Sequence, residues 1–273
     1  MKILVTNDDG ILSPVLTLLA NALNREHEVL VVAPAADQSG MSHSFTHGAD
    51  RRLTYKAEPS YPYPVFQVVG TPCDCVKFAV SHLYRGVEID LVISGINLGE
   101  NAGMSAVYSG TVAAAREGAM WGIPALAVSV WKNSPEHLQN AVDWLIKLLR
   151  RPDLLPLRPR SKAKTGGPVD IGPGPVWNIN FPPCDPGSIE GVEVTSMSTV
   201  MFEDGYEAGV THHGIPNFRL VGFKPPEKFR EGTDDWALHR NRIAITPLQV
   251  DQSHDLEAAR LTDMRSVWEA MYR

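Results

Sequence analysis

The sequence predicts a doubly wound α/β fold, in which helices cover both faces of a mostly parallel sheet. Three observations predict it. Short apolar runs alternate with helix-like amphipathic segments through the first 150 residues. The runs are apolar throughout, as in strands that are buried on both faces. Several of them end in polar turns that contain Gly or Pro.

The first elements form a βαβ unit. Residues 2–6 are an apolar run that ends abruptly in an Asn-Asp-Asp-Gly turn, which indicates a buried strand. Pro14 opens a segment with apolar residues at helical spacing, and residues 29–33 form a second strand-like run before Pro34. The alternation then continues, with strands expected over 65–69, 90–93 and 125–130 and helices over 75–83, 110–122 and 135–149.

The last third of the chain has a different character. Residues 151–175 are rich in Pro, Gly, Lys and Arg and are expected to form a flexible loop that separates a core (1–150) from the remainder (176–273). Further strands are expected over 176–181, 192–196 and 242–246, and an amphipathic helix over 255–272. Residues 199–235 lack long apolar faces of their own, so we expect an oligomeric interface or exchanged arm there.

Composition limits the partners and the location. The net charge of −6 and a pI near 5.8 provide no general field for long nucleic acid. No run reaches the roughly 18 apolar residues that span a bilayer, and the first residues do not resemble a signal peptide. We therefore expect no membrane partner, a cytoplasmic location and three reduced cysteines.

Polar residues gather at the ends of three expected strands. Ligands of open α/β sheets bind outside the carboxyl ends of the strands, where this chain has polar segments at 7–10, 37–40 and 94–101. Adjacent carboxylates such as Asp8 and Asp9 repel each other, and a bound Mg²⁺ or Mn²⁺ would relieve the repulsion. The alternative is that both carboxylates cap the following helix and point to water.

A second feature is the Ser-Gly-Thr turn at 109–111, which leads into an Ala-rich helix. Free backbone N–H groups and hydroxyls at such a helix terminus can bind phosphate, although an ordinary N-cap is the commoner explanation of this pattern taken alone. The chain has no P-loop, no dinucleotide fingerprint and no serine-hydrolase elbow. Four histidines lie in segments that are expected to be loops or turns: His43, His47, His212 and His213. Each could act as a general acid or bind phosphate, or could be an ordinary surface residue.

Taken together, these motifs resemble the SurE family of survival-protein nucleotidases. The resemblance rests on the segments at 3–10, 32–34, 38–40, 94–101 and 108–115, in the same order and spacing, and on later pieces at 122–129, 178–182, 233–234 and 245–251. It implies a Rossmann-like core and a C-terminal part that is exchanged between subunits of a dimer, often assembled into tetramers. It also implies a metal-dependent phosphatase of 5′- and 3′-nucleoside monophosphates, in some members also of short polyphosphate.

The resemblance also assigns the metal site. It places one divalent cation, Mg²⁺ or Mn²⁺, on Asp8, Asp9, Ser39 and Asn97. The chain departs from the family at Val15, where Gly is usual, and in a longer stretch around 158–175, but neither touches a metal position. Residues 199–230 match only loosely, so no substrate contact is carried over to His212 or His213.

On this basis we hypothesise hydrolysis by a metal-activated water that attacks phosphorus in line. The expected catalytic residues are Asp8, Asp9, Asn101 and Ser109, with Asp8 or Asp9 orienting or deprotonating the water. The expected phosphate contacts are Asn7, Asn97, Ser109, Gly110 and Thr111. Two rivals remain: a non-catalytic nucleotide sensor, and a phosphotransferase that works through an aspartyl-phosphate.

Overall fold

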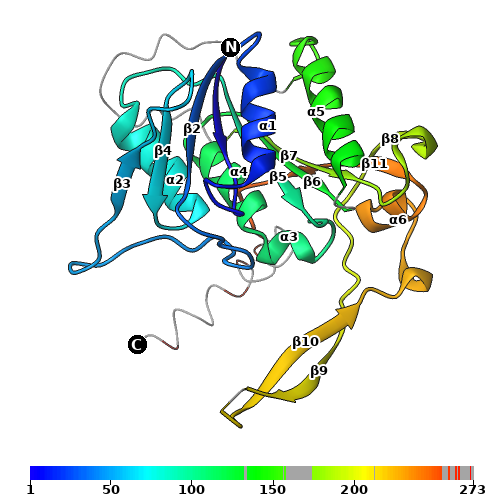
Figure 1. Cartoon of the computed structure of the whole chain (residues 1–273). Helices are drawn as coiled ribbons and strands as arrows, with labels where there is room; N and C mark the ends of the chain where they lie inside the picture. Colours follow the sequence, from blue (N-terminus) through cyan, green and yellow to red (C-terminus); the bar gives the residue numbers. More distant parts are fainter. Residues whose placement is uncertain are drawn as a thin grey trace.

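The computed structural model describes residues 1–131, 134–155, 157, 174–211 and 213–253, together with 258, 262, 264 and 271. Its centre is a nine-stranded sheet in the order β3-β4-β2-β1-β5-β6-β7-β11-β8, and a separate hairpin pairs β9 with β10 (Figure 1). The run from β4 to β7 is parallel, whereas β3 and β11 each pair antiparallel with their inner neighbour. The predicted α/β class is therefore confirmed.

The elements follow the predicted alternation. The strands of the sheet are β1 (Lys2–Thr6), β2 (Glu28–Pro34), β3 (Thr54–Ala57), β4 (Val65–Val69), β5 (Leu91–Leu98), β6 (Ala125–Val130), β7 (Val176–Phe181), β8 (Gly191–Val194) and β11 (Arg242–Leu248). The helices are α1 (Pro14–Leu23), α2 (Pro72–Phe78), α3 (Ser105–Tyr108), α4 (Gly110–Met120), α5 (Pro135–Leu149) and α6 (Asp234–His239), with a π-helical turn over Ala79–Leu83.

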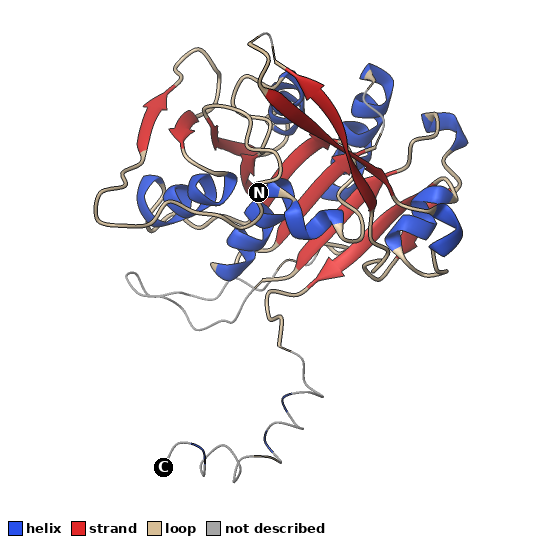
Figure 2. Cartoon of the chain, turned by 90° about the horizontal axis from the view of Figure 1, so that it is seen from below, coloured by secondary structure: helices blue, strands red, loops and turns tan. Residues whose placement is uncertain are grey.

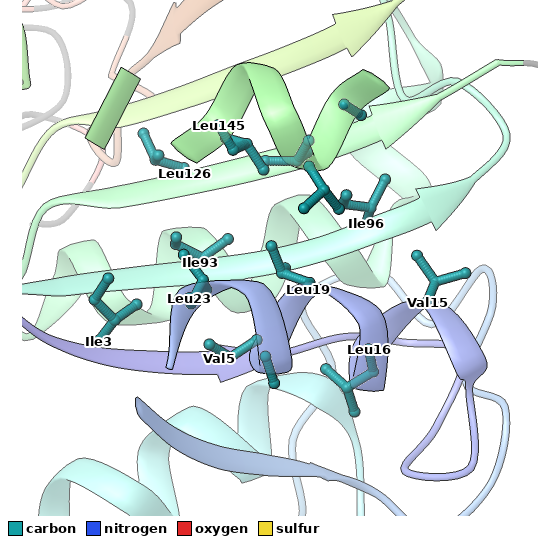
Figure 3. Close-up of a cluster of buried hydrophobic side chains, with 14 of the residues drawn as sticks. Ile3, Val5, Val15, Leu16, Leu19, Leu23, Ile93, Ile96, Leu126 and Leu145 are labelled. Carbon is teal, nitrogen blue, oxygen red and sulfur yellow. The ribbon is translucent and has the colours of Figure 1, made fainter. Parts of the chain in front are cut away.

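Helices cover both faces of the sheet, and the side-chain alternation of the strands explains how. In β1, Ile3 and Val5 belong to the apolar cluster beneath α1 and α5 (Figure 3), whereas Leu4 belongs to the cluster beneath α2 and α4. All three side chains are completely buried. A strand that is buried on both faces must be apolar at every position, which is why residues 2–6 show no polar alternation.

Several boundaries differ from the sequence prediction for local reasons. Helix α2 begins at Pro72 rather than at residue 75, because Thr71 and Asp74 form a capping box upstream of the apolar residues. Strand β5 continues to Leu98, beyond the predicted end at residue 93, and pairs with β6 past an irregularity in register at 95–97. The short edge strand β3, whose side chains are all exposed, was not predicted.

The C-terminal third contains a projecting hairpin that the sequence predicted only as a β-rich arm. Strands β9 (Glu203–Val210) and β10 (Pro216–Phe223) extend away from the sheet (Figure 1), and Figure 2 shows them in front of it. Tyr206 lies opposite Leu220 and Ala208 opposite Phe218, so one face of the hairpin is apolar. The sequence shows no core-facing pattern here because the apolar face stays exposed in the described structure: Tyr206, Phe218 and Leu220 are 71%, 65% and 58% exposed.

Two predicted segments lie largely or wholly outside the described residues. These are the loop over 151–175, of which 151–155, 157, 174 and 175 are described, and the helix over 255–272, of which only 258, 262, 264 and 271 are described. The remaining strands β7, β11 and β8 extend the same sheet as β1. In the described part of the chain, no helix is long and apolar enough to cross a membrane.

Candidate active site at the carboxyl edge of the sheet

The end of β1 brings one of its two adjacent carboxylates against the first turn of α4. Asp8 is 4% exposed, and its Oδ1 accepts a hydrogen bond from Thr111 Oγ1 at 2.5 Å. Its Oδ2 accepts one from the backbone N–H of Thr111 at 3.2 Å. A Cβ at Gly110 would lie 3.0 Å from Asp8 Oδ2, so a larger residue would push the carboxylate away. The structure therefore joins three predicted site residues: Asp8, Gly110 and Thr111.

The carboxyl groups of Asp8 and Asp9 both have raised pKa values. Burial raises the pKa of Asp8, and the hydrogen bonds from Thr111 oppose that shift only in part. Burial, followed by the negative charges of Asp8 and Asp37, raises the pKa of Asp9 to about 6. Among the described residues, no lysine or arginine forms an ion pair with Asp8 or Asp9. Nothing in the described chain neutralises this pair.

The turn after β2 lies beside this pair. The backbone N–H of Gln38 donates to the Asp8 carbonyl oxygen at 2.8 Å, which fixes the turn against the end of β1. Asp37 Oδ1 accepts hydrogen bonds from Ser39 N–H at 2.7 Å and from Ser39 Oγ at 2.6 Å. Asp37 was not among the predicted site residues, although it opens the same polar segment at 37–40. It orients Ser39, which stands exposed at the edge.

The end of β5 supplies Asn97 at the same edge. Strands β1 and β5 are parallel neighbours with Thr6 opposite Ser94, so Asn97 follows directly beyond the paired part. Its Nδ2 donates to the carbonyl oxygen of Gly99 at 2.8 Å. The four predicted metal positions thus lie at the same edge of the sheet, and no hydrogen bond among the described residues links Ser39 or Asn97 to the two aspartates.

Asn101 lies in a polar network that involves strands β6 and β7. Its backbone N–H donates to Asn180 Oδ1 at 2.8 Å, and its Nδ2 donates to Ser129 Oγ at 2.8 Å. Its carbonyl oxygen accepts a hydrogen bond from Asn178 Nδ2 at 2.7 Å. Sequence reasoning missed the roles of Asn178, Asn180 and Ser129. The signal was present, since Asn at 178 and 180 interrupts an otherwise apolar buried strand.

The remaining predicted residues have structural partners. Asn7 Nδ2 donates to the Gly10 carbonyl oxygen at 3.0 Å and holds the turn after β1. Ser109 is the N-cap of α4, and its Oγ accepts the Val112 N–H at 3.0 Å. The alternative N-cap reading of the Ser-Gly-Thr turn is thus present in the structure, at the same helix terminus that faces Asp8.

Of the four loop histidines, the three that the structure describes form no hydrogen bond or ion pair with Asp8 or Asp9. His43 Nε2 lies 3.0 Å from Oε2 of the buried Glu117, whose other oxygen binds Lys77, so His43 anchors its loop to α4. These hydrogen-bond partners lower the pKa of Glu117 to about 2 against the opposing effect of burial. The ring of His47 lies beside Phe45, and His213 is exposed. His212 lies outside the described residues.

The edge fits a divalent cation that prefers oxygen ligands. Four buried oxygens accept or donate no hydrogen bond among the described residues: Thr6 Oγ1, Asn7 Oδ1, Asp9 Oδ2 and Ser94 Oγ. Orphaned polar atoms of this kind are rare in folded proteins and call for a partner. In the described ranges, no group of three His, Cys, Asp or Glu side chains is arranged around a metal, so hydroxyl and amide oxygens must complete any site here.

Comparison with known proteins gives a consistent result. A family model described as "Survival protein SurE" matches residues 3–204. A relative from Thermus thermophilus named "5'-nucleotidase SurE 1" is 40% identical over 256 residues, which cover 92% of each chain. Another from Methylocella silvestris, named "5'-nucleotidase SurE", is 38% identical over 92% of this chain and 94% of its own.

The fold has a solved counterpart as well. The crystal structure of the SurE protein from Aquifex aeolicus superposes with a TM-score of 0.73 at 29% sequence identity. The match covers 97% of this chain and 100% of the other. The sequence relatives and the solved structure all carry the name SurE, and each matches this chain over nearly its whole length.

Proposed function

The chain belongs to the SurE family, and we propose that it is a divalent-metal-dependent phosphomonoesterase that hydrolyses nucleoside 5′-monophosphates to nucleoside and phosphate. The observation that carries the proposal is the pair Asp8 and Asp9, which no cation among the described residues neutralises and of which Asp8 is buried against the N-terminus of α4. A site with two carboxylates and a helix N-terminus suits a cation and a phosphate together. We propose 3′-monophosphates and short polyphosphates as further substrates on the family resemblance alone.

We assign the cation to Asp8, Asp9, Ser39 and Asn97, which present the hard oxygen ligands that Mg²⁺ and Mn²⁺ prefer. The chemistry that such an ion supplies is charge neutralisation, polarisation of the phosphoryl group and a lowered pKa of water. Asp37 holds Ser39 through two hydrogen bonds, and Thr111 holds Asp8, so the chain orients two of the four ligands itself.

The chain's own groups bind the phosphate and orient the nucleophile. The N-terminus of α4, where Ser109, Gly110 and Thr111 lie, carries the partial positive charge that stabilises phosphoryl oxygens. We assign Asn7, Asn97 and Asn101 to the remaining oxygens. Asp9, with one unpartnered carboxylate oxygen, orients the attacking water in line with the leaving alcohol.

The test is phosphate release after chelation, with Mg²⁺ and Mn²⁺ added back separately and with 5′-monophosphates, 3′-monophosphates and short polyphosphates as substrates. We expect metal-dependent release from 5′-monophosphates that is unaffected by Asp143→Asn, a change in an exposed carboxylate on α5. Saturable nucleotide binding without release would identify a sensor instead. An acid-stable, alkali-labile phosphoprotein would identify a phosphotransferase.

We further propose that the hairpin joins copies of this chain in a dimer or tetramer by arm exchange. Its apolar face, with Tyr206, Phe218 and Leu220, is exposed in the single chain and would be covered in an oligomer. Light scattering should give a dimeric or tetrameric mass for the wild type and a smaller mass for Phe218→Ser. A monomeric wild type would contradict the proposal.

A further inference from the structure

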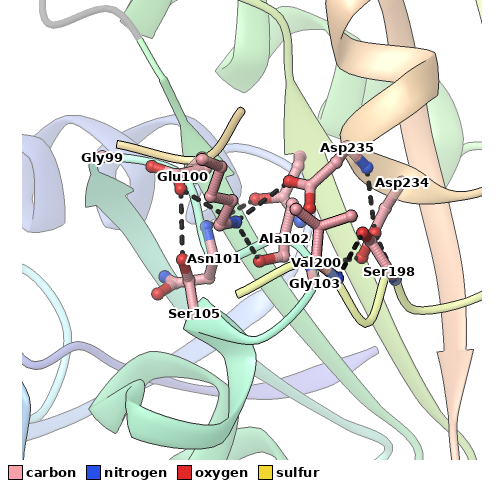
Figure 4. Close-up of polar contacts among 12 residues, drawn as sticks. Gly99, Glu100, Asn101, Ala102, Gly103, Ser105, Ser198, Val200, Asp234 and Asp235 are labelled. Atoms are coloured by element: carbon pink, nitrogen blue, oxygen red, sulfur yellow. Dashed lines mark hydrogen bonds and ion pairs between the residues drawn. The ribbon is translucent and has the colours of Figure 1, made fainter. Parts of the chain in front are cut away.

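The base of the hairpin is joined to the loop that carries Asn101 by a buried ion cluster. Lys224 directly follows β10, and its Nζ lies 3.0 Å from Asp235 Oδ1 and 2.8 Å from the carbonyl oxygen of Ala102. It also lies 3.3 Å from Oε1 of Glu100. The side chains of Lys224 and Asp235 are 6% and 1% exposed. Figure 4 shows Glu100, Ala102 and Asp235 converging on this cluster.

Backbone hydrogen bonds to Asp234 accompany the ion pairs. Asp234 Oδ2 accepts the N–H of Gly103 at 2.7 Å, and its Oδ1 accepts the N–H of Ser198 at 2.8 Å (Figure 4). Gly103 has a φ of +49°, and a Cβ there would lie 2.6 Å from Asp235 Oδ2. The loop therefore approaches the aspartates as closely as a glycine backbone allows.

The chain positions of these contacts bracket Asn101. Glu100 and Ala102 contact Lys224, and Gly103 contacts Asp234, whereas Asn101 itself is held from the sheet side by Asn178 and Asn180. Asn101 thus stands between two anchors, one in the sheet and one at the base of the hairpin. Removing the second anchor would leave the orientation of its side chain to Ser129 and the two asparagines alone.

Lys224 is the cation of the cluster, and it forms ion pairs with two carboxylates, those of Glu100 and Asp235. Burial raises the pKa of Asp234, and the neighbouring charge of Asp235 adds to that shift. Asp235 Oδ2 is buried and accepts no hydrogen bond from the described residues. Without the ammonium group, the charges of Glu100, Asp234 and Asp235 would repel one another in a poorly solvated space, and the loop would separate from the base of the hairpin.

We propose that Lys224 is a positioning residue for the reaction: through Glu100, Ala102 and Asp235 it fixes the loop over 99–105 and so the side chain of Asn101. The inference rests on the proposed function for its kinetic part. It also connects the hairpin, a candidate oligomerisation element, to the site, because Lys224 belongs to the hairpin's base.

The experiment compares Lys224→Met, which keeps length but removes the charge, with Lys224→Arg and Glu100→Gln. The matched control is Lys228→Met, which removes the ammonium of an exposed pair with Glu203 at the same end of the hairpin. Backbone amide exchange is measured over 99–105 and over 110–120, and kcat and KM for a nucleoside 5′-monophosphate are measured with saturating Mg²⁺ or Mn²⁺.

We expect Lys224→Met to speed exchange over 99–105 at least tenfold, leave 110–120 unchanged and lower kcat about tenfold or more with KM within threefold. Lys224→Arg should restore most of kcat, and Lys228→Met should match the wild type. If Lys224→Met does not fold, Glu100→Gln should show the same pattern with smaller changes.

Unchanged exchange over 99–105, or faster exchange with unchanged kcat, would overturn the positioning role. A wild type that releases no phosphate with any metal would instead count against the proposed function, and the exchange data would still decide whether Lys224 fixes the loop.

Discussion

The molecule contains two pairs of consecutive aspartates in buried surroundings. The negative charges of the two pairs are compensated in different ways. Asp234 and Asp235 begin helix α6, where backbone N–H groups of Gly103 and Ser198 and the ammonium of Lys224 bind them. Asp8 and Asp9 follow strand β1, where Thr111 binds one carboxylate and no described cation binds either. The Asp234–Asp235 pair has a cation within the chain, whereas the Asp8–Asp9 pair has none among the described residues.

The difference separates a structural cluster from a candidate catalytic one. A buried carboxylate with a raised pKa lowers the stability of the folded chain at neutral pH. Proteins retain such groups mainly at functional sites, where a ligand binds them. Asp234 also has a raised pKa, but Lys224 Nζ lies 3.0 Å from Oδ1 of its neighbour Asp235, so that pair has a cation of its own. Among the described residues the Asp8–Asp9 pair has none, and we expect a cation from outside the chain to bind it. Each prediction below changes one pair and uses the other as its reference.

The largest effect should come from Asp9→Asn. We expect phosphate release to fall by about three orders of magnitude or more, because the change removes a metal ligand and charge stabilisation of the transition state. The free energy of unfolding in chelator should stay the same or rise, since Asn relieves the repulsion from Asp8 and Asp37. Turnover near that of the wild type at saturating Mg²⁺ or Mn²⁺ would refute the assignment.

The free energy of unfolding should respond to charge removal with the opposite sign at the Asp234–Asp235 pair. Lys224→Met should lower the free energy of unfolding by about 3 kcal/mol, because it leaves buried carboxylates without their cation. Adding Asp235→Asn to that variant should recover about 1 kcal/mol of the loss, whereas Asp235→Asn alone should destabilise. Denaturant unfolding at one fixed protomer concentration measures the cycle; purely additive losses would show that the two side chains are not coupled.

The two pairs also differ in how much the sequence revealed. Asp8 and Asp9 follow an apolar strand at a carboxyl edge, a position that is typical of ligand sites. Helix capping remained the alternative for this turn, and the family resemblance led to the metal prediction. The partner of Asp8, Thr111, lies 103 residues further along the chain, and the Ser-Gly-Thr motif marked it independently. Local sequence and fold topology together marked both features as candidates, because both stand at the ends of regular elements.

Lys224 and Asp235 carried no comparable signal. Neither interrupts an apolar run, and Lys224 meets Ala102 across 122 residues through an irregular connection. Asp37 was missed for a related reason, since its effect on Ser39 is a turn geometry that composition does not encode. The hairpin strands were missed because their apolar side chains stay exposed in the described structure, so the strands show no core-facing pattern.

Metal removal should separate the pairs next. A cation held at 100 times its dissociation constant should stabilise the wild type by about 2.7 kcal/mol relative to chelated protein. Asp9→Asn should lose this increment, and Lys224→Met should keep it, because its change lies at the other pair. Thermal unfolding with and without Mg²⁺ or Mn²⁺ measures both, and an equal increment in Asp9→Asn would place the cation elsewhere.

The smallest effect concerns pH and follows from Asp9, whose pKa is raised from 3.8 to about 6 in the folded chain. A raised carboxyl pKa means that the folded state holds a proton that the unfolded state has already released. The stability from this group is therefore fully present below about pH 4 and is lost as the pH rises through 6. We expect a loss of about 1–2 kcal/mol, less than the full shift implies, because Asp9 is partly exposed and water screens its charge.

The measurement is the difference in unfolding free energy between the wild type and Asp9→Asn in chelator, from pH 4 to pH 7. Subtracting the variant cancels the other titrating groups, Asp234 among them, whose pKa is also raised by burial. The stability of the wild type relative to the variant should fall across this window, and added Mn²⁺ should reverse the fall above pH 6, because the cation competes with the proton for the same carboxylate. A difference that stays flat would mean that Asp9 is already neutralised by the chain, and the contrast between the two pairs would disappear.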